Sequence, residues 1–134
     1  MRIVLDSNVI MAAFAARGLC NALFEHCLEN HDIFLCEDIL SEISEKLIKK
    51  IRLSKPISDK IINYLRSHAH IVEPEKVSPK ACRDKNDLMV LGSALKGKAD
   101  YIITGDKDLL IINIFQGVKI VNPRSFWNKM KKLK

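Results

Sequence analysis

The stretch CRDKNDLMVLGSALKGKADYIITGDKDLL, residues 82–110, contains the pattern that decides the fold. Its apolar positions predict a helix over residues 85–96, a buried strand over 100–104 and a short helical turn over 107–110. Four aspartates stand at the ends of these elements: Asp84, Asp87, Asp106 and Asp108. A carboxylate in such a place costs free energy unless backbone N–H groups or a cation stabilise its charge. Helix capping and metal binding are therefore the two interpretations to compare.

The rest of the chain repeats this alternation of strands and helices. Short apolar runs predict strands at residues 2–6, 32–36, 70–73 and 118–122, and helical spacing predicts the segments that connect them. Strands that are apolar throughout favour a parallel sheet with helices on both faces. We therefore expect one α/β domain over residues 1–134. It should be a three-layer α/β/α sandwich around a mostly parallel sheet of four to five strands.

Several residues indicate where the connecting helices begin and end. Asn30 is typical of a C-cap for a helix over residues 19–29, and Asp38 can N-cap the long helix that follows the second strand. Pro56 is expected to end that helix, and Ser58 to start the next one. Pro123 fits the first position of the last helix.

The composition is that of an ordinary soluble domain, with 48% hydrophobic and 28% charged residues. No apolar run approaches the length of a membrane span, and the N-terminus lacks a signal-peptide pattern. We therefore expect a cytoplasmic protein that does not contact membranes. The four cysteines show no metal-binding spacing, and we predict neither a disulfide framework nor a function for them.

Positive charge is concentrated in two segments of a chain whose formal net charge is +6. One is KLIKKIRLSK, residues 46–55, and the other is RSFWNKMKKLK, residues 124–134. Basic clusters near acidic motifs favour a polyanionic partner whose phosphates the bases contact. The alternative is a helix face that is charged only because it is solvated.

Five acids are expected at one edge of the predicted sheet. Ligands of an open parallel sheet bind beyond the carboxyl ends of its strands. Asp6 ends the first strand, Asp106 and Asp108 follow residues 100–104, Asp87 lies in the first turn of helix 85–96, and Glu42 lies one turn into the helix after the second strand. All five can face the same rim.

Each acid also has an ordinary structural explanation. Asp6 can cap the helix that begins near Asn8, Asp84 with Asp87 can form a pair like a capping box, and Asp106 can cap the turn after it. Glu42 can be a solvated helix acid.

The acids taken together favour the metal interpretation. Asp87 and Glu42 fall beside the apolar stripes of their helices, and an acid that faces inward needs a partner. The predicted strands contain no basic residue apart from Arg2 and Lys119 near their beginnings. Several carboxylates at one rim repel one another unless a cation joins them, and oxygen ligands of this kind select Mg²⁺ or Mn²⁺.

Four motifs in this order give the chain its resemblance to a known family. They are VLDSNV at 4–9, SEISEKL at 41–47, RDKNDLMVLGSAL at 83–95 and DYIITGDKDLL at 100–110. Together they resemble the PIN domain family of nucleases over nearly the whole chain, and within it the VapC-like branch of toxins. Leu88 departs from the pattern, since many relatives of this branch carry a further acid there.

The resemblance implies a parallel sheet between helices, with an acidic pocket that binds Mg²⁺ or Mn²⁺ and cuts RNA. It also implies a toxin of a toxin–antitoxin system, with an antitoxin protein as partner and a homodimer as a possible assembly. The residues that match the catalytic acids of the family are Asp6, Glu42, Asp87 and Asp106.

From the resemblance we predict a role for each residue. Asp6, Asp87 and Asp106 are expected to hold the metal, and Glu42 to hold or activate water. The polar residues expected to support the site are Asn8, Asp84, Thr104 and Asp108. The basic residues expected to contact RNA phosphates are Lys46, Lys49, Lys50, Arg52, Lys85 and Lys107.

Other functions fit parts of the pattern. A phosphatase with an aspartate nucleophile would use Asp6, but it needs a second acid where this chain has Asn8, which cannot donate a proton as a general acid. A PIN module that binds RNA or protein with little catalysis is a further alternative, as is a nuclease for DNA or for ribosomal RNA processing. No residue distinguishes RNA from DNA in the sequence alone.

Overall fold

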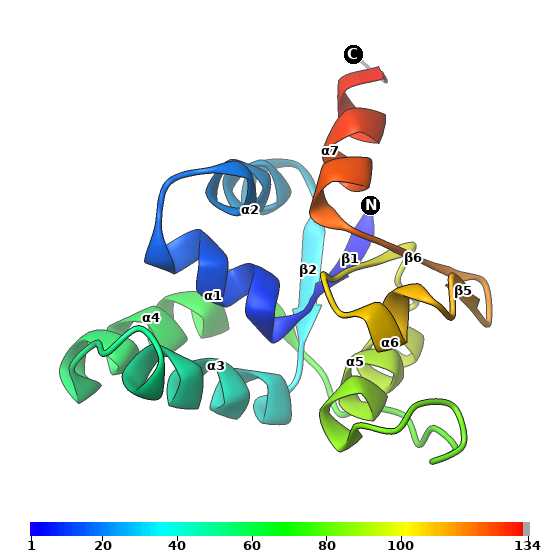
Figure 1. Ribbon diagram of the computed structural model, residues 1–134, viewed down its shortest axis with the longest axis horizontal. Helices are drawn as coiled ribbons and strands as arrows, with labels where there is room; N and C mark the ends of the chain where they lie inside the picture. The colour runs from blue at the N-terminus through cyan, green and yellow to red at the C-terminus, as the bar shows by residue number, and fades with distance from the viewer. Residues whose placement is uncertain (133–134) are drawn as a thin grey trace.

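The structure, a computed structural model, describes residues 1–132 of the chain, so Lys134 of the basic C-terminal segment lies outside the described residues. Strands and helices alternate along the chain (Figure 1). The strands are β1 (Arg2–Leu5), β2 (Asp32–Leu35), β3 (His70–Ile71), β4 (Tyr101–Ile103), β5 (Ile114–Phe115) and β6 (Val118–Val121). The helices are α1 (Ser7–Ala15), α2 (Leu19–Asn30), α3 (Glu37–Lys49), α4 (Lys55–His68), α5 (Lys85–Lys96), α6 (Lys107–Leu110) and α7 (Pro123–Lys132).

The described residues form one sheet of six strands in the order β3-β2-β1-β4-β6-β5. All neighbouring strands are parallel except β5, which is antiparallel to β6. The mostly parallel α/β sheet is confirmed, but the expected four to five strands were too few. The additional strand, β5, has two residues and reaches β6 through a tight turn in which Gln116 and Gly117 have φ of 47° and 86°. Its two apolar residues, Ile114 and Phe115, come soon after the apolar residues of α6, so no pattern marked them as a separate strand.

Helices cover both faces of the central strands. Three consecutive residues of β1, namely Ile3, Val4 and Leu5, are fully buried, although successive side chains of a strand point to opposite faces. Helix α5 contacts β1, β2 and β4, and α2 contacts β2. In Figure 1, α1 and α2 lie on one side of β1 and β2, and α5 lies on the other. The continuous apolar pattern of the strands therefore has the origin that the sequence indicated.

The apolar residues of α1 and α2 belong to this core. Val9 and Ile10 of α1 and Leu23 and Phe24 of α2 are all buried. Within residues 1–132 no single helix is long and apolar enough to cross a membrane. Helices α1 and α2 meet that criterion only when joined, and they are bent by 109° at the break between them.

Two helix starts differ from those expected. Asp38 does not cap α3, because β2 leads directly into the helix, so that Cys36 takes the N-cap position and Asp38 lies in the first turn. Helix α4 starts at Lys55 and not at Ser58. Pro56 stands in its first turn, where a missing N–H is harmless, and Ser54 caps the helix by accepting a hydrogen bond from the Ile57 N–H.

The strand order creates a switch point between β1 and β4. From β1 the chain builds outward through β2 to β3, and it then returns to place β4 on the other side of β1. The chain therefore leaves the carboxyl ends of β1 and β4 in opposite directions, which opens a crevice between them. Asp6 follows β1 directly, and Thr104 follows β4 directly.

Candidate functional site

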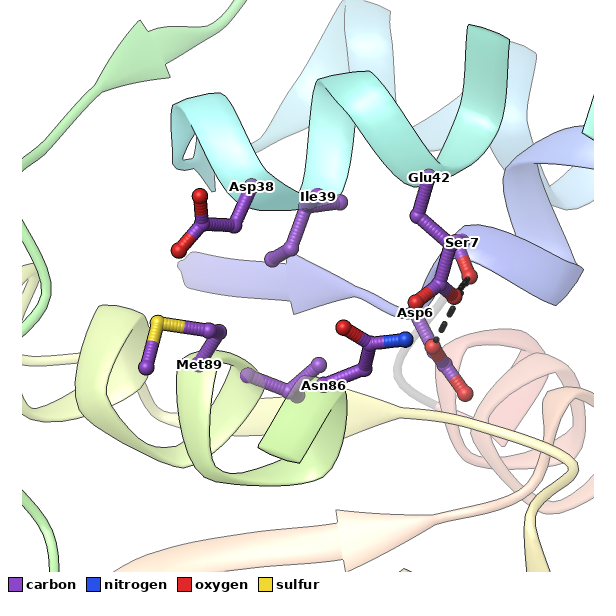
Figure 2. A pocket seen from close by; sticks show the side chains of 8 residues that line it. Asp6, Ser7, Asp38, Ile39, Glu42, Asn86 and Met89 are labelled. Carbon is purple, nitrogen blue, oxygen red and sulfur yellow. Dashed lines mark hydrogen bonds between the residues drawn. The ribbon is translucent and has the colours of Figure 1, made fainter. Parts of the chain in front are cut away.

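A narrow cleft lies at the switch point (Figure 2). The start of α1, one side of α3 and the first turns of α5 form its walls. The residues that line it are Asp6, Ser7, Asp38, Ile39, Glu42, Asn86, Met89 and Val90. Of these, Asp6 and Glu42 were predicted from the sequence as site residues, whereas Ser7 and Asn86 were not. The available signal was their place in the acidic motifs, since Ser7 follows Asp6 and Asn86 precedes Asp87.

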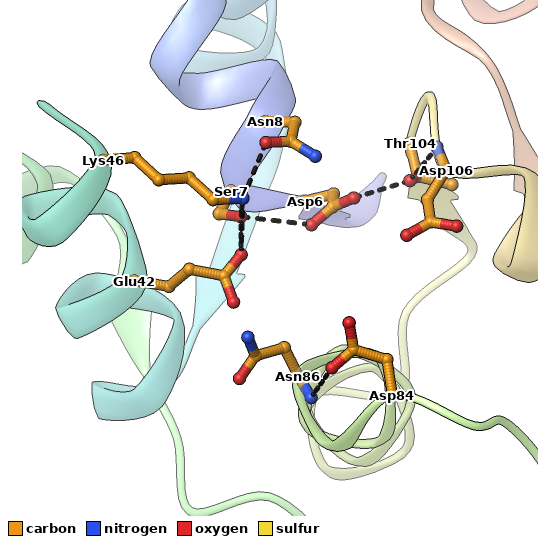
Figure 3. A network of polar contacts seen from close by, with 9 residues as sticks. All are labelled: Asp6, Ser7, Asn8, Glu42, Lys46, Asp84, Asn86, Thr104 and Asp106. Carbon is orange, nitrogen blue, oxygen red and sulfur yellow. Dashed lines mark hydrogen bonds and ion pairs between the residues drawn. The ribbon is translucent and has the colours of Figure 1, made fainter. Parts of the chain in front are cut away.

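Asp6 is the buried acid at the end of β1. The residue is 5% exposed, and its side chain makes no hydrogen bond that caps α1, so capping does not account for it. Instead, the hydroxyl of Thr104 donates to Asp6 Oδ2 over 2.7 Å and accepts a hydrogen bond from the Asp106 N–H over 2.9 Å (Figure 3). Burial raises the pKa of Asp6. Thr104 thus joins the carboxyl ends of β1 and β4 through their acids.

Asp87 brings a second buried carboxylate from the first turn of α5. The residue is 4% exposed. Its Oδ2 lies 3.4 Å from the thiol of Cys82, which donates to it. Burial, together with the charges of Asp106, Asp84 and Asp6, raises the pKa of Asp87 to about 6. The charged form of this acid is therefore disfavoured in the absence of a cation.

Two of the acids do cap helices. Asp84 Oδ1 accepts the N–H of Asn86 at the start of α5, and Asp106 Oδ1 accepts the N–H of Asp108 at the start of α6, both over 2.8 Å. The capping interpretation is thus correct for Asp84 and Asp106, but Asp84 and Asp87 do not form the expected pair like a capping box, since Asp87 accepts from Cys82 instead. For Asp106 it is incomplete, because oxygens of Asp87, Asp106 and Asp108 also lie within 4.8 Å of one another. Asp108, which was expected only beside the site, is therefore one of the three acids in this cluster. Asp6 is linked to the cluster through Thr104, which bonds both Asp6 and the N–H of Asp106.

Glu42 forms the opposite wall together with a lysine. Lys46 Nζ lies 3.0 Å from Glu42 Oε1, 2.7 Å from Asn8 Oδ1 and 3.3 Å from Ser7 Oγ. The Ser7 hydroxyl donates to the same Glu42 oxygen. Figure 3 shows Lys46, Ser7 and Glu42 on one side of the opening and Asp106 on the other. Lys46, predicted to contact RNA, is thus bound within the site itself.

The acids of the site differ in whether a basic residue neutralises them. Lys46 pairs with Glu42, and Arg83 lies 3.2 Å from Asp108. Among residues 1–132, no Lys, Arg or His forms an ion pair with Asp6, Asp87 or Asp106. These are the three acids that the sequence analysis proposed as metal ligands. Their oxygen atoms are hard donors of the kind that Mg²⁺ and Mn²⁺ prefer.

Two grooves with basic residues flank the acids. One, of about 210 Å³, runs along α3 and is lined by Glu42, Glu45, Lys46, Lys49, Lys50 and Asn86. The other, of about 380 Å³, lies beside Asp108 and includes Lys80, Arg83 and the apolar Ile111. The remaining lysines predicted to contact RNA, Lys85 and Lys107, are exposed in the first turns of α5 and α6, and Arg52 is exposed after α3.

Fold and site together define a class of protein. It is an α/β domain with a cluster of carboxylates at the switch point of a parallel sheet, a set of oxygen donors suited to a divalent cation. The family model described as PIN domain matches residues 2–108. The chain therefore belongs to the PIN domain family, as its four motifs indicated.

Solved structures share this fold at low sequence identity. VapBC-1 from nontypeable Haemophilus influenzae superposes with a TM-score of 0.66 at 17% identity, covering 92% of this chain and 99% of that one. VapBC2 from Rickettsia felis, bound to a DNA fragment from its promoter, gives 0.63 at 16% identity, covering 91% and 98%. PAE2754 from Pyrobaculum aerophilum gives 0.59 at 13% identity, covering 98% and 90%. No curated protein matches the chain.

Proposed function

We propose that this chain is a metal-dependent endoribonuclease, the toxin of a toxin–antitoxin pair, which hydrolyses phosphodiester bonds of cytoplasmic RNA with Mg²⁺ or Mn²⁺. The observation that carries the proposal is the state of Asp6, Asp87 and Asp106. Two of them are buried, and none forms an ion pair with a described basic residue. Such acids destabilise a fold unless a cation joins them, so their presence at a switch point supports a catalytic metal site.

Oxygens of Asp87, Asp106 and Asp108 lie close enough together to fit a divalent ion. Asp87 and Asp106 would hold it, Asp108 could contribute an oxygen, and Asp6, linked to Asp106 through Thr104, would complete the set of ligands. A bound Mg²⁺ or Mn²⁺ supplies Lewis acidity, which lowers the pKa of water and stabilises charge that develops on a phosphoryl group. In this site Thr104 keeps the carboxylate of Asp6 in one orientation through its 2.7 Å hydrogen bond.

We assign to Glu42 the role of holding and deprotonating the water that attacks the phosphate. Lys46 and Ser7 both donate to its Oε1, which fixes the carboxylate in the cleft wall. Its other oxygen, Oε2, would accept a proton from a water held between Glu42 and the aspartates. Because the cleft is narrow, the water and the scissile phosphate would meet in a restricted geometry, as positional catalysis requires.

The flanking grooves support a polyanionic substrate longer than one nucleotide. Lys49 and Lys50 lie on one side of the acids, and Lys80 and Arg83 lie on the other. Lysine and arginine on both sides can contact successive phosphates of a strand that crosses the cleft. Grooves on both sides of the acids support cleavage within a strand rather than from an end.

The toxin role draws its support from the family and from the fold shared with the VapBC structures. By the same likeness we infer a cognate antitoxin as protein partner, and a homodimer as the assembly to test. Expression of the wild-type chain alone should arrest growth. Asp87→Asn should relieve the arrest at equal protein level.

The decisive experiment measures cleavage of an end-labelled single-stranded RNA oligonucleotide by the purified protein. We expect internal cuts with Mn²⁺ or Mg²⁺, no cuts with EDTA, and no cuts by Asp87→Asn. Asp59→Asn, an exposed acid on α4 that pairs with Lys55, is the matched control and should cleave normally. EDTA-resistant cutting would contradict the proposal.

Parallel assays separate the alternative functions. Turnover of p-nitrophenyl phosphate without RNA cleavage would indicate the phosphatase. RNA binding without cleavage at any metal concentration would indicate a catalytically weak binding module. A DNA oligonucleotide of the same sequence tests the choice of nucleic acid.

A further inference from the structure

Lys46 has an unusual place for a lysine, since its charged end lies within the cleft wall. The side chain is 21% exposed. Its ammonium group reaches Asn8 Oδ1, Glu42 Oε1 and Ser7 Oγ at 2.7, 3.0 and 3.3 Å. An ammonium group has three hydrogens to donate, so residues of the site occupy all of them.

The other cations near the acids are held much more loosely. Arg83 reaches Asp108, but its side chain is 87% exposed. Lys49 pairs with Glu45 and is 73% exposed. Solvated ion pairs of this kind form and break at little cost in free energy. Lys46, with three contacts and little exposure, is by contrast a fixed positive charge of the site.

This fixed charge divides the site into two halves. In the half that contains Glu42, one carboxylate oxygen accepts hydrogen bonds from both Lys46 and Ser7. That carboxylate is already compensated by a cation of the chain. In the other half, Asp87 and Asp106 approach each other without a basic partner among the described residues. The one cation that pairs with an acid of this second half is the solvated Arg83 beside Asp108, so among the described residues no fixed positive charge compensates Asp87 and Asp106.

We propose that Lys46 is a built-in cation that replaces a second divalent ion, so that the site takes a single ion on the side of Asp87 and Asp106. The inference rests on the proposed function, because it assumes that the ion is a cofactor. A second ion beside Glu42 would be repelled by the ammonium and would have to displace it from three oxygen atoms. Without the charge of Lys46, the Glu42 carboxylate becomes available as a ligand.

The experiment titrates the purified protein with Mn²⁺ and measures the number of ions bound per chain. Calorimetry and the EPR signal of unbound Mn²⁺ both report that number. Wild type and Lys46→Arg should bind about one ion per chain, since both keep the charge. Lys46→Met, which keeps the length of the side chain without its charge, should bind about two. The double variant Glu42→Gln/Lys46→Met should return to about one, because it lacks the carboxylate that the second ion needs.

Each outcome decides the inference. Circular dichroism verifies the fold, and Lys46→Gln is the second uncharged variant should Lys46→Met fail to fold. Two ions in a wild-type chain that cleaves RNA would overturn the inference and leave the proposed function in place. A single ion in both uncharged variants would also overturn it. A wild-type chain that binds no ion would overturn both.

Discussion

Acids at the two ends of the parallel sheet differ in their burial and in their hydrogen-bond and ion-pair partners. At the amino ends of the strands, Asp32 is exposed and lies 3.5 Å from His70, and the exposed Asp100 accepts the N–H of Arg2 over 2.9 Å. At the carboxyl ends, Asp6 and Asp87 are buried without a basic partner among the described residues. The exposed, paired acids stabilise the fold, and the buried, unpaired acids destabilise it.

This contrast separates structural from functional carboxylates within one molecule. Burial of an unpaired acid is disfavoured, so the site acids reduce the stability of the metal-free chain. Proteins tolerate such a loss of stability at functional sites, where the residues that function requires are not those that stabilise the fold. Substitution of an acid at the carboxyl ends should therefore reduce cleavage and, without metal, stabilise the chain, whereas substitution at the amino ends should only lower stability.

The largest difference should appear in cleavage rate. Asp6→Asn keeps the shape of the side chain and removes its charge, which should reduce metal-dependent RNA cleavage by roughly 10²–10³-fold or more, as expected for the loss of several kcal/mol of electrostatic stabilisation. Asp32→Asn at the amino end should cleave within about twofold of wild type. Single-turnover kinetics on one RNA substrate measures both. Full activity in Asp6→Asn would exclude its metal role.

A smaller effect on cleavage should come from Thr104. Thr104→Val removes the hydroxyl that Asp6 and the Asp106 N–H share, and we expect cleavage to fall by about 10–100-fold, as for the loss of a group that orients a metal ligand. Unfolding should become easier by about 1–3 kcal/mol, because the N–H of Asp106 loses its partner. Thr104→Ser retains the hydroxyl and should retain most of the rate. An inactive Thr104→Ser would contradict this role.

Stability should change in the opposite direction at the two ends. Without metal at pH 8, Asp87→Asn should raise the free energy of unfolding by about 1–3 kcal/mol, because it removes a buried charge. Asp100→Ala should lower it by about 0.5–1.5 kcal/mol, because the Arg2 N–H loses an acceptor. Urea denaturation measures both variants. Stabilisation by Asp100→Ala, or destabilisation by Asp87→Asn, would break the contrast.

The stability of the metal-free chain should also depend on pH through Asp87. Its pKa rises from 3.8 in the unfolded chain to about 6 in the fold. Between these values the folded chain retains a proton that the unfolded chain has lost, so the free energy of unfolding falls as pH rises from about 4 to about 6. Asp87→Asn should flatten this slope. An unchanged slope in the variant would assign the dependence to other groups.

Much of the fold and part of the site could be predicted from the sequence. Asp6 and Thr104 were placed correctly at strand ends, because a parallel sheet puts all carboxyl ends at one edge. The contact of Lys46 with Asn8 and Ser7 could not be predicted. It depends on how closely α1 packs against α3, and no periodicity within one segment contains that distance. Only the spacing of Lys46 and Glu42, four residues apart, was visible.

The errors at helix starts have the same origin. Asp38 has the side chain of an N-cap, but the chain enters α3 straight from β2, and Cys36 takes that position. Pro56 was interpreted as a breaker, although the first turn of a helix accepts proline. Local preference shows which residues can cap a helix, and tertiary structure decides which of them does.

The smallest effect should come from Arg2, which holds the amino end together. Its Nε donates to the carbonyl of Gly97 over 2.6 Å, and its guanidinium lies 4.5 Å from the centre of the Phe34 ring. Arg2→Met should lower the free energy of unfolding by about 0.5–1.5 kcal/mol and leave cleavage unchanged, while Arg2→Lys, which keeps the charge near the ring, should lose less. Because the fully buried Ile3, Val4 and Leu5 lie between Arg2 and Asp6, the loss of these contacts at the amino end should leave the position of Asp6 unchanged. A cleavage defect in folded Arg2→Met would show that the two ends are coupled through β1. The separation between structural residues at the amino ends and functional acids at the carboxyl ends would then fail.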